Sequence, residues 1–423
     1  MAIKKKATLL IQNIGQLVTM QGPSPRIGAA MNELGLIRNG AVAAAGEEIL
    51  AVGESDKVVG QTTLALGCTV IDAQGGVVTP GLIDPHTHPI FSATREDEFE
   101  MRLQGKSYME IAAAGGGIRR SVRDLRNTPR QILLDKAKGR LDRFLEHGVT
   151  TIEAKSGYGL SLESELKQLE IIRELHEHHP VDLIPTFLGA HEFPDEYRND
   201  REGYVELLIR EMIPAVSAAQ LAVFSDVFCE EGVFTNDQSS RIQQAAKQHG
   251  LKIKFHADEL ASGEGAELAA SLGATSADHL VYISDSGIRA LAEAGTAAVL
   301  LPGTSYSLGS KQYAPARKMI EQEVVLALST DCNPGSNYSE SLPMMISLAA
   351  VHMKLTAAEA ISAVTVNAAY AIGKQGEIGV IEVGKQADLV VWDMADYREL
   401  AYHYGVNLAR SVVKRGKVAA SRS

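Results

Sequence analysis

Residues 77–88, VVTPGLIDPHTH, join an apolar, β-branched run to two histidines spaced two residues apart. Such a run predicts a buried strand, here at 77–84, because β-branched side chains fit a pleated surface. Alternate residues of an extended segment point to the same side, so His86 and His88 could bind one metal ion. A lone His-x-His motif is a weak signal, since two ordinary loop histidines would look the same.

Seven further apolar or β-branched runs follow this one, and amphipathic segments separate them. The expected strands lie at 149–155, 181–189, 223–229, 251–256, 274–280, 296–302 and 324–331. Helical patterns lie at 130–147, 162–178, 202–218, 237–249, 263–272, 285–294, 315–321 and 340–353, and a last helix is expected at 356–373. Eight strand–helix units predict an α/β fold, a (β/α)₈ TIM barrel. A doubly wound open sheet is the alternative, because periodicity cannot show closure.

Strand patterns at both ends of the chain predict a second, smaller domain. A single core stops growing near about 250–300 residues, so 423 residues favour two domains. We expect 1–72 and 374–423 to form a small β-sandwich and 73–373 to form the barrel. The longest irregular insert, 89–128, contains three consecutive glycines at 115–117. This triplet lacks the strand, lysine and spacing of a phosphate loop and is expected to be a flexible lid or a plain turn.

Composition restricts the classes of function. The net charge of −11 argues against nucleic acid or an anionic membrane as the main partner. The three cysteines, Cys68, Cys229 and Cys332, form neither a disulfide framework nor a Cys-x-x-Cys pair. The start of the chain lacks the apolar region of a signal peptide, and no stretch reaches about 18 uninterrupted apolar residues. We therefore expect a soluble, cytoplasmic protein.

Three more polar side chains end later strands, namely His256, His279 and Asp331. The carboxyl ends of barrel strands converge on one face, where catalytic groups lie. Asp331 alone could be a core or capping residue, but four strands that end in metal-type ligands are hard to attribute to chance. We therefore expect these side chains to meet at the mouth of the barrel.

The predicted metal ligands are three imidazole nitrogens and one carboxylate oxygen: His86, His88, His256 and Asp331. This set suits one zinc ion and also one iron ion per chain. Glu259 follows His256 by three residues and could carry the proton of a metal-bound water. The alternative is that Glu259 lies in the first turn of the next helix, where a carboxylate is favourable.

Several longer runs resemble the metal-dependent amidohydrolase superfamily: PGLIDPHTH, HADE, SADHL, STDCNPGS and TVNAAYAIG, followed by GEIGVIEVGKQADLVVWD. More closely, nearly the whole chain resembles the imidazolonepropionase family of histidine breakdown. The stretches THPIFSATREDEFEMR, EAKSGYGL, FLGAHEFPDEY and STDCNPGS carry this resemblance. It implies the metal set above and a homodimer. It also implies that substrate or product contacts Arg95, Tyr158, His191, Glu259, Asn333, Gly335 and Ser336.

The resemblance implies that a metal-bound hydroxide opens the ring of 4-imidazolone-5-propanoate to give N-formimidoyl-L-glutamate. Glu259 and Asp331 are the candidates to accept the proton of the water, and His279 is placed to stabilise the nucleophile or the oxyanion. Arg95 could bind the carboxylate of the substrate through two parallel hydrogen bonds. Lys155 ends the second strand near the bridging lysine of two-metal relatives, but the one-metal branch implies a structural or electrostatic role.

Two other functions stay open on the sequence alone. A hydrolytic deaminase of a nucleobase-like amidine would use the same metal site but would release ammonia. A catalytically inactive binding or scaffold protein could share the fold, although it would not need four ligands together with Glu259 and His279.

Overall fold

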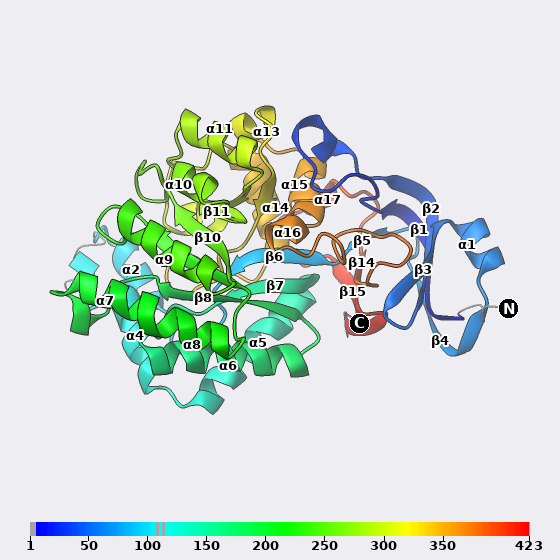
Figure 1. Cartoon of the computed structure of the whole chain (residues 1–423). Coiled ribbons are helices and arrows are strands. Elements are labelled where there is room, and N and C mark those ends of the chain that lie inside the picture. The colour runs from blue at the N-terminus through cyan, green and yellow to red at the C-terminus, as the bar shows by residue number, and fades with distance from the viewer. Residues whose placement is uncertain (1–5, 107–109, 112–114, 423) are drawn as a thin grey trace.

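Two eight-stranded sheets organise the computed structural model, which describes residues 6–106, 110–111 and 115–422 (Figure 1). The larger domain contains a parallel sheet in the order β13-β12-β11-β10-β9-β8-β7-β6. Its strands are β6 (Leu82–Thr87), β7 (Val149–Lys155), β8 (Asp182–Ala190), β9 (Phe224–Cys229), β10 (Lys252–Ala257), β11 (Ser276–His279), β12 (Ala297–Leu300) and β13 (Leu326–Leu328).

The first and last strands of this sheet meet just beyond their carboxyl ends. Thr87 and Cys332 form a parallel bridge. The backbone N–H of His88 donates to the Cys332 carbonyl at 2.9 Å, and the N–H of Asp331 donates to the His86 carbonyl at 3.1 Å. The predicted barrel is confirmed, and the open doubly wound sheet is wrong.

Helices lie around the barrel, as Figure 1 shows. They are α5 (Arg130–Glu146), α6 (Leu162–His178), α7 (Arg201–Leu207), α8 (Ile213–Ala218), α9 (Asn236–Gln248), α10 (Gly265–Ser271), α11 (Asp285–Ala294), α12 (Pro302–Ser307), α13 (Ala316–Glu321) and α14 (Leu342–Met353). A π-helical turn, η3 (Leu208–Met212), joins α7 to α8 just before Pro214, which has no N–H to donate. The capping box of Thr235 and Gln238 starts α9.

The helix expected at 356–373 is two helices, α15 (Ala357–Ala363) and α16 (Val366–Ala371). Between them, Thr365 has φ −127° and ψ −97°, outside the helical region. The Asn367 side chain donates to the carbonyls of Arg26 and Leu326 at 2.9 Å and accepts from the Arg26 N–H at 2.8 Å. These tertiary bonds hold α16 against distant segments and override the continuous helical pattern.

The second sheet joins both ends of the chain in the order β16-β15-β14-β5-β1-β2-β3, with β4 paired to β1. Its strands are β1 (Ala7–Val18), β2 (Leu36–Ala45), β3 (Glu48–Glu54), β4 (Leu64–Asp72), β5 (Val77–Pro80), β14 (Leu389–Trp392), β15 (Ala409–Lys414) and β16 (Lys417–Ser421). Short helices η1 (Gly28–Asn32), α1 (Ser55–Gln61) and α17 (Glu399–Tyr402) accompany it. The predicted β unit built from both termini is confirmed as a sandwich-like second fold unit.

The prediction of a single barrel strand at 77–84 is wrong in one respect. It divides into β5, which pairs with β1 and β14 in the terminal sheet, and β6, which begins the barrel. A Cβ atom at Gly81, between them, would overlap the Thr150 side chain, so only glycine fits where the chain passes from one sheet to the other. The domain limits at 72/73 and 373/374 stay a prediction.

The insert at 89–128 is more regular than expected where the structure describes it. It contains α2 (Glu96–Leu103) and α4 (Ile118–Asn127), while 107–109 and 112–114 lie outside the described residues. Glu98, which is buried, accepts from the Gly117 N–H at 3.1 Å and lies 3.7 Å from Arg95 Nη1. The prediction of an irregular insert is therefore wrong for α2 and α4. The hydrogen bond from Gly117 to Glu98 joins these two helices.

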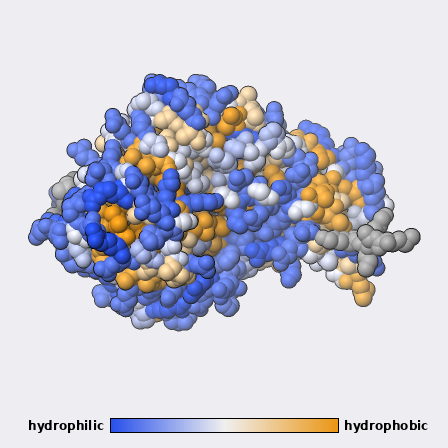
Figure 2. Space-filling view, in the orientation of Figure 1, coloured by the Kyte–Doolittle hydropathy of each residue, from blue (hydrophilic) through white to orange (hydrophobic). Residues whose placement is uncertain are grey.

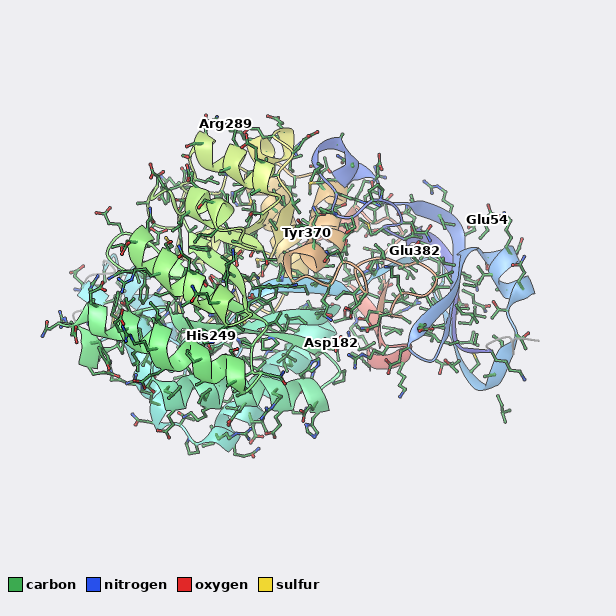
Figure 3. The ribbon with its side chains drawn as sticks, viewed as in Figure 1. Glu54, Asp182, His249, Arg289, Tyr370 and Glu382 are labelled. Atoms are coloured by element: carbon green, nitrogen blue, oxygen red, sulfur yellow. The ribbon has the colours of Figure 1, made fainter. Side chains whose placement is uncertain are left out.

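Polar contacts join the barrel to the terminal sheet. Asp182, at the start of β8, lies where the barrel faces the terminal strands (Figure 3). Its carboxylate lies 2.7 Å from Lys414 Nζ and 2.7 Å from Arg415 Nη2. Within the terminal sheet, the fully buried Trp392 of β14 donates from its indole nitrogen to the Thr79 hydroxyl of β5 at 2.9 Å.

The visible surface is mainly hydrophilic, with apolar side chains gathered on parts of both lobes (Figure 2). No helix among the described residues has the length and hydropathy needed to cross a membrane.

Candidate metal centre and active site

His86, in β6, and His88, just after it, lie beside the aspartate that follows β13. The Nε2 atoms of His86 and His88 are 3.3 Å apart. Asp331 Oδ1 lies 3.6 Å from His86 Nε2 and 3.5 Å from His88 Nε2. All three side chains are buried. Closure of the barrel thus brings together residues about 245 positions apart.

Two more histidines complete the cluster from the opposite strands. The ring centroid of His86 lies 4.5 Å from that of His256 and 5.4 Å from that of His279. One ligand atom from each of these three residues lies within 4.8 Å of the other two. The same holds for His86, His88 and Asp331. Both groups share His86, so the four predicted ligands surround one region. Three nitrogens and a carboxylate oxygen are a donor set that zinc or iron accepts.

Two aspartates orient the imidazole rings. Asp278 Oδ2 lies 2.6 Å from His86 Nδ1, and Asp226 Oδ2 lies 3.0 Å from His256 Nδ1. A carboxylate at Nδ1 leaves Nε2 as the metal-binding atom. Sequence reasoning missed both aspartates. The available signal was a carboxylate inside an apolar strand pattern, which is costly to bury without a partner.

The electrostatics of the cluster favour the neutral imidazole at His86, His88 and His279, but not at His256. Burial, together with the positive charge of Lys155 and the neighbouring histidines, lowers the pKa of His86 and His88 well below the usual value. Burial likewise lowers the pKa of His279. For His256, burial lowers the pKa, but the Asp226 carboxylate outweighs it and the pKa is raised. Neutral imidazole is the form that binds a metal ion.

Glu259 lies beside His279 in a bend that follows β10. Its Oε2 atom is 3.5 Å from His279 Nε2. The Glu230 carboxylate accepts hydrogen bonds from the backbone N–H groups of Glu259 and Leu260, which fixes this bend. Because α10 begins at Gly265, Glu259 does not belong to the first turn of that helix.

Both carboxyl groups at the centre have raised pKa values. Burial raises the pKa of Glu259 to about 8, and the nearby Asp331 adds to the effect. Burial raises the pKa of Asp331 to about 6, although the Thr304 hydroxyl, 2.6 Å from Oδ2, opposes the shift. Groups with such pKa values can both accept and return a proton near neutral pH.

An aromatic wall lies next to His88. The His191 ring is stacked on that of His88 with centroids 5.2 Å apart, and the Tyr158 ring lies 5.9 Å from His88 and 5.4 Å from His191. His191 Nδ1 lies 3.0 Å from the Gly157 carbonyl oxygen, so its Nε2 atom is the one left for other partners. The structure thus places Tyr158 and His191 beside the predicted metal ligands.

The turn at 333–336 lies on another side of the cluster. Asn333 Oδ1 accepts from the N–H groups of Gly335 and Ser336 at 2.8 Å each, and Ser336 Oγ lies 3.5 Å from Asp331 Oδ2. Arg95 Nε donates to the Pro334 carbonyl at 3.5 Å. The residues that the resemblance implied as substrate contacts therefore lie near the metal ligands, on this turn or, for Arg95, in contact with it.

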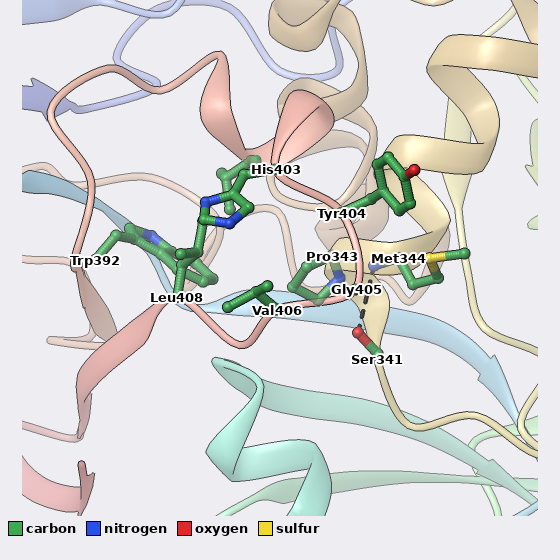
Figure 4. Close-up of a pocket in the computed structure, with 10 residues that line it drawn as sticks. Ser341, Pro343, Met344, Trp392, His403, Tyr404, Gly405, Val406 and Leu408 are labelled. Carbon is green, nitrogen blue, oxygen red and sulfur yellow. Dashed lines mark hydrogen bonds between the residues drawn. The ribbon is translucent and has the colours of Figure 1, made fainter.

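A separate pocket lies between α14 and α17 (Figure 4). Ser341, Trp392, His403 and Tyr404 are among its lining residues, and Ser341 Oγ accepts from the Met344 N–H at 3.3 Å. Its lining includes none of the residues of the histidine cluster. We therefore assign the candidate active site to the mouth of the barrel.

Comparison with known proteins gives consistent results. A family model described as "Amidohydrolase family" matches residues 77–418. The chain is 52% identical to an imidazolonepropionase of Geobacillus kaustophilus (strain HTA426) over 413 residues, which are 97% of each chain. It is 49% identical to an imidazolonepropionase of Brevibacillus brevis over 411 residues, 96% of this chain and 97% of the relative.

Solved structures of low sequence identity share the fold. An adenosine deaminase from Xanthomonas campestris with bound zinc superposes with a TM-score of 0.72 at 20% identity, covering 98% of this chain and 93% of that one. Guanine deaminase of E. coli superposes with a TM-score of 0.74 at 15% identity, covering 98% of this chain and 99% of that one.

Proposed function

Because the chain belongs to the amidohydrolase family and, within it, to the imidazolonepropionases, we propose that it hydrolyses 4-imidazolone-5-propanoate to N-formimidoyl-L-glutamate in histidine degradation. The reaction consumes one water. The bond between the ring carbonyl carbon and its nitrogen breaks, the carbon becomes a carboxylate, and the nitrogen leaves within the formimidoyl group. The observation that carries the proposal is the buried cluster of His86, His88, His256 and Asp331 beside Glu259.

One zinc or iron ion held by these four side chains is part of the proposal. A bound ion of this kind polarises a carbonyl group and lowers the pKa of a coordinated water to about 7. The neutral imidazoles and the carboxylate of Asp331 match the ligands that both metals accept.

The side chains around the cluster divide the remaining work. Glu259 accepts the proton of the attacking water and returns a proton to the departing ring nitrogen, with Asp331 as the second candidate for the first transfer. His279, 3.5 Å from Glu259, donates a hydrogen bond to the developing oxyanion. Arg95 binds the propanoate carboxylate, and Tyr158, His191 and the 333–336 turn orient the ring.

The test is loss of the ultraviolet absorbance of freshly made imidazolonepropanoate, combined with metal analysis of the purified protein. We expect turnover without ammonia and about one zinc or iron per chain. Ammonia release from an amidine substrate, without turnover of imidazolonepropanoate, would favour a hydrolytic deaminase instead. Protein that holds no metal would favour a catalytically inactive relative.

A cytoplasmic location and a homodimer belong to the same proposal. Three free cysteines, two of them buried, support a reducing compartment. The homodimer follows from the family resemblance. Light scattering on the protein as it elutes from a size-exclusion column tests the homodimer. A mass near the 45.3 kDa of one chain would contradict the homodimer.

A further inference from the structure

Five charged side chains lie beneath the metal ligands, inside the barrel, and the proposed reaction does not use them. They are Glu153, Lys155, Asp226, Lys254 and Asp278, each at most 1% exposed. Removing a charged group from water costs several kcal/mol unless partners compensate for it. The arrangement of this charged layer therefore needs a physical explanation.

Lys155 is at the centre of the charged layer. Its Nζ atom lies 2.8 Å from Glu153 Oε1, 2.7 Å from Asp226 Oδ2 and 3.8 Å from Asp278 Oδ2. The same Asp226 oxygen lies 3.0 Å from His256 Nδ1, and the same Asp278 oxygen lies 2.6 Å from His86 Nδ1. One ammonium group thus contacts the two carboxylate oxygens that orient two of the predicted metal ligands.

We propose that Lys155 is a positioning residue, whose ammonium group holds Asp226 and Asp278 so that their carboxylates fix the rings of His256 and His86 for one metal ion. The inference rests on the proposed function, which supplies the metal. Without Lys155, two carboxylates would share the layer with a single remaining ammonium and with Glu153. Their mutual repulsion would then move one of them, or protonate it, and release the attached imidazole.

The ionisation of the layer agrees with this role. Burial would raise the pKa of Asp226, but the Lys155 ammonium outweighs burial and lowers it well below the usual value. In return, Asp226 and Glu153 raise the pKa of Lys155 against the opposing effect of burial. The two carboxylates at 2.8 and 2.7 Å from Nζ fit an ammonium group, rather than a modified amine that bridges two metals.

Lys254 offers a matched control from the neighbouring strand. It is equally buried, donates from Nζ to the Pro85 carbonyl at 2.9 Å, and lies 3.2 Å from Glu153 Oε1. Among the residues that the structure describes, no ion pair within 4 Å joins Lys254 to Asp226 or Asp278. Against the effect of burial, its charge lowers the pKa of Asp278 even more than that of Lys155 does, but its short contacts are to Glu153 and Pro85, so it does not fix the position of either aspartate oxygen.

The experiment compares Lys155→Met with Lys254→Met in the full-length protein. Each variant is depleted of metal, and its Zn²⁺ affinity is measured by competition with a chromophoric chelator, while circular dichroism reports the fold. We expect Lys155→Met to bind Zn²⁺ about 10–100-fold more weakly than the unmodified chain. The loss of Zn²⁺ affinity in Lys254→Met should be several-fold smaller than the loss in Lys155→Met.

Unchanged affinity in Lys155→Met would overturn the proposal. Equal losses in both variants would also overturn it, because any buried charge would then have the same effect. If Lys155→Met does not fold, Asp278→Asn serves instead, since it keeps the side-chain volume and removes the charge that Lys155 attracts. We expect weakened Zn²⁺ binding there, and unchanged binding would overturn the proposal. Unmodified protein that binds Zn²⁺ but does not turn over imidazolonepropanoate would overturn the proposed function and leave the role of Lys155 intact.

Discussion

The guanidinium group of Arg95 lies where a side chain at position 335 would otherwise be. A Cβ atom added to Gly335 would overlap Nη2 of Arg95 and lie 2.9 Å from its Nε atom. Glycine at 335 is therefore a condition for the position of Arg95, the residue proposed to bind the propanoate carboxylate. Two positions that are 240 residues apart in sequence thus determine one proposed contact with the substrate.

Gly335→Ala should raise KM because the new methyl group displaces Arg95. Loss of one charge-assisted contact is worth about 1.5–3 kcal/mol, or roughly 10–150-fold in KM. Steady-state kinetics on imidazolonepropanoate measure the effect. Gly60→Ala is the control, since nothing lies within 4 Å of a Cβ atom there and its φ is not positive. Equal KM values for Gly335→Ala and the control would contradict the prediction.

Glu259→Gln should lower kcat by about 10²–10⁴-fold, since the amide cannot accept or return a proton. Metal content should not change, because Glu259 is not among the predicted ligands. Kinetics and metal analysis on the same preparation measure both quantities. Glu264→Gln, an exposed glutamate nearby, is the control. A fully metallated Glu259→Gln protein with unchanged kcat would remove Glu259 from the proton transfer.

Asp182→Asn should destabilise the junction between the barrel and the terminal sheet by about 1–3 kcal/mol at neutral pH, because Lys414 and Arg415 lose a partner. Burial raises the pKa of Asp182, but Lys414 and Arg415 outweigh it, so the pKa is lowered in the folded state. The stabilisation is therefore complete above the unfolded pKa, about 3.9, and is lost as the pH falls through the folded pKa.

Unfolding experiments in denaturant at pH 7 and near pH 3 measure this difference. The difference in free energy of unfolding between the unmodified chain and Asp182→Asn should be smaller at the lower pH. Asp285→Asn, which breaks an exposed pair with Lys318, is the control and should change the free energy of unfolding little. A difference in free energy of unfolding that is larger near pH 3 than at pH 7 would contradict the lowered pKa of Asp182 in the folded state.

Removal of metal with a chelator should abolish turnover and lower the unfolding temperature. A ligand that binds only the folded state at 100 times its dissociation constant stabilises it by about 2.7 kcal/mol. Addition of Zn²⁺ or Fe²⁺ should restore the unfolding temperature, as thermal shift measurements would show. The Asp331→Asn variant should respond much less. If added metal raised the unfolding temperature of Asp331→Asn as much as that of the unmodified chain, this result would argue against Asp331 as a ligand.

Much of the barrel could be predicted from local sequence patterns. The expected strand at 149–155 and the expected helix at 162–178 coincide with β7 and α6. The convergence of His86, His256 and Asp331 also followed from topology, because parallel barrel strands direct their carboxyl ends to one face.

What could not be predicted depends on contacts between distant segments. The break at Gly81 results from the close approach of Thr150, and the break at Thr365 from the bonds that Asn367 makes to Arg26 and Leu326. The carboxylates of Asp226 and Asp278 can be assigned a role only when the histidines beside them are known. Strand patterns contain no information about these pairings.

The position of β5 between β1 and β14 has a consequence for synthesis of the protein. The segment that leads directly into His86 and His88 cannot complete its hydrogen bonding until residues near 390 have left the ribosome. A nascent chain that stalls before β14 presents an open, apolar edge at β5, which invites association with other chains. Translation to the last few dozen codons is therefore required before β5, which leads into β6, is hydrogen-bonded on both sides.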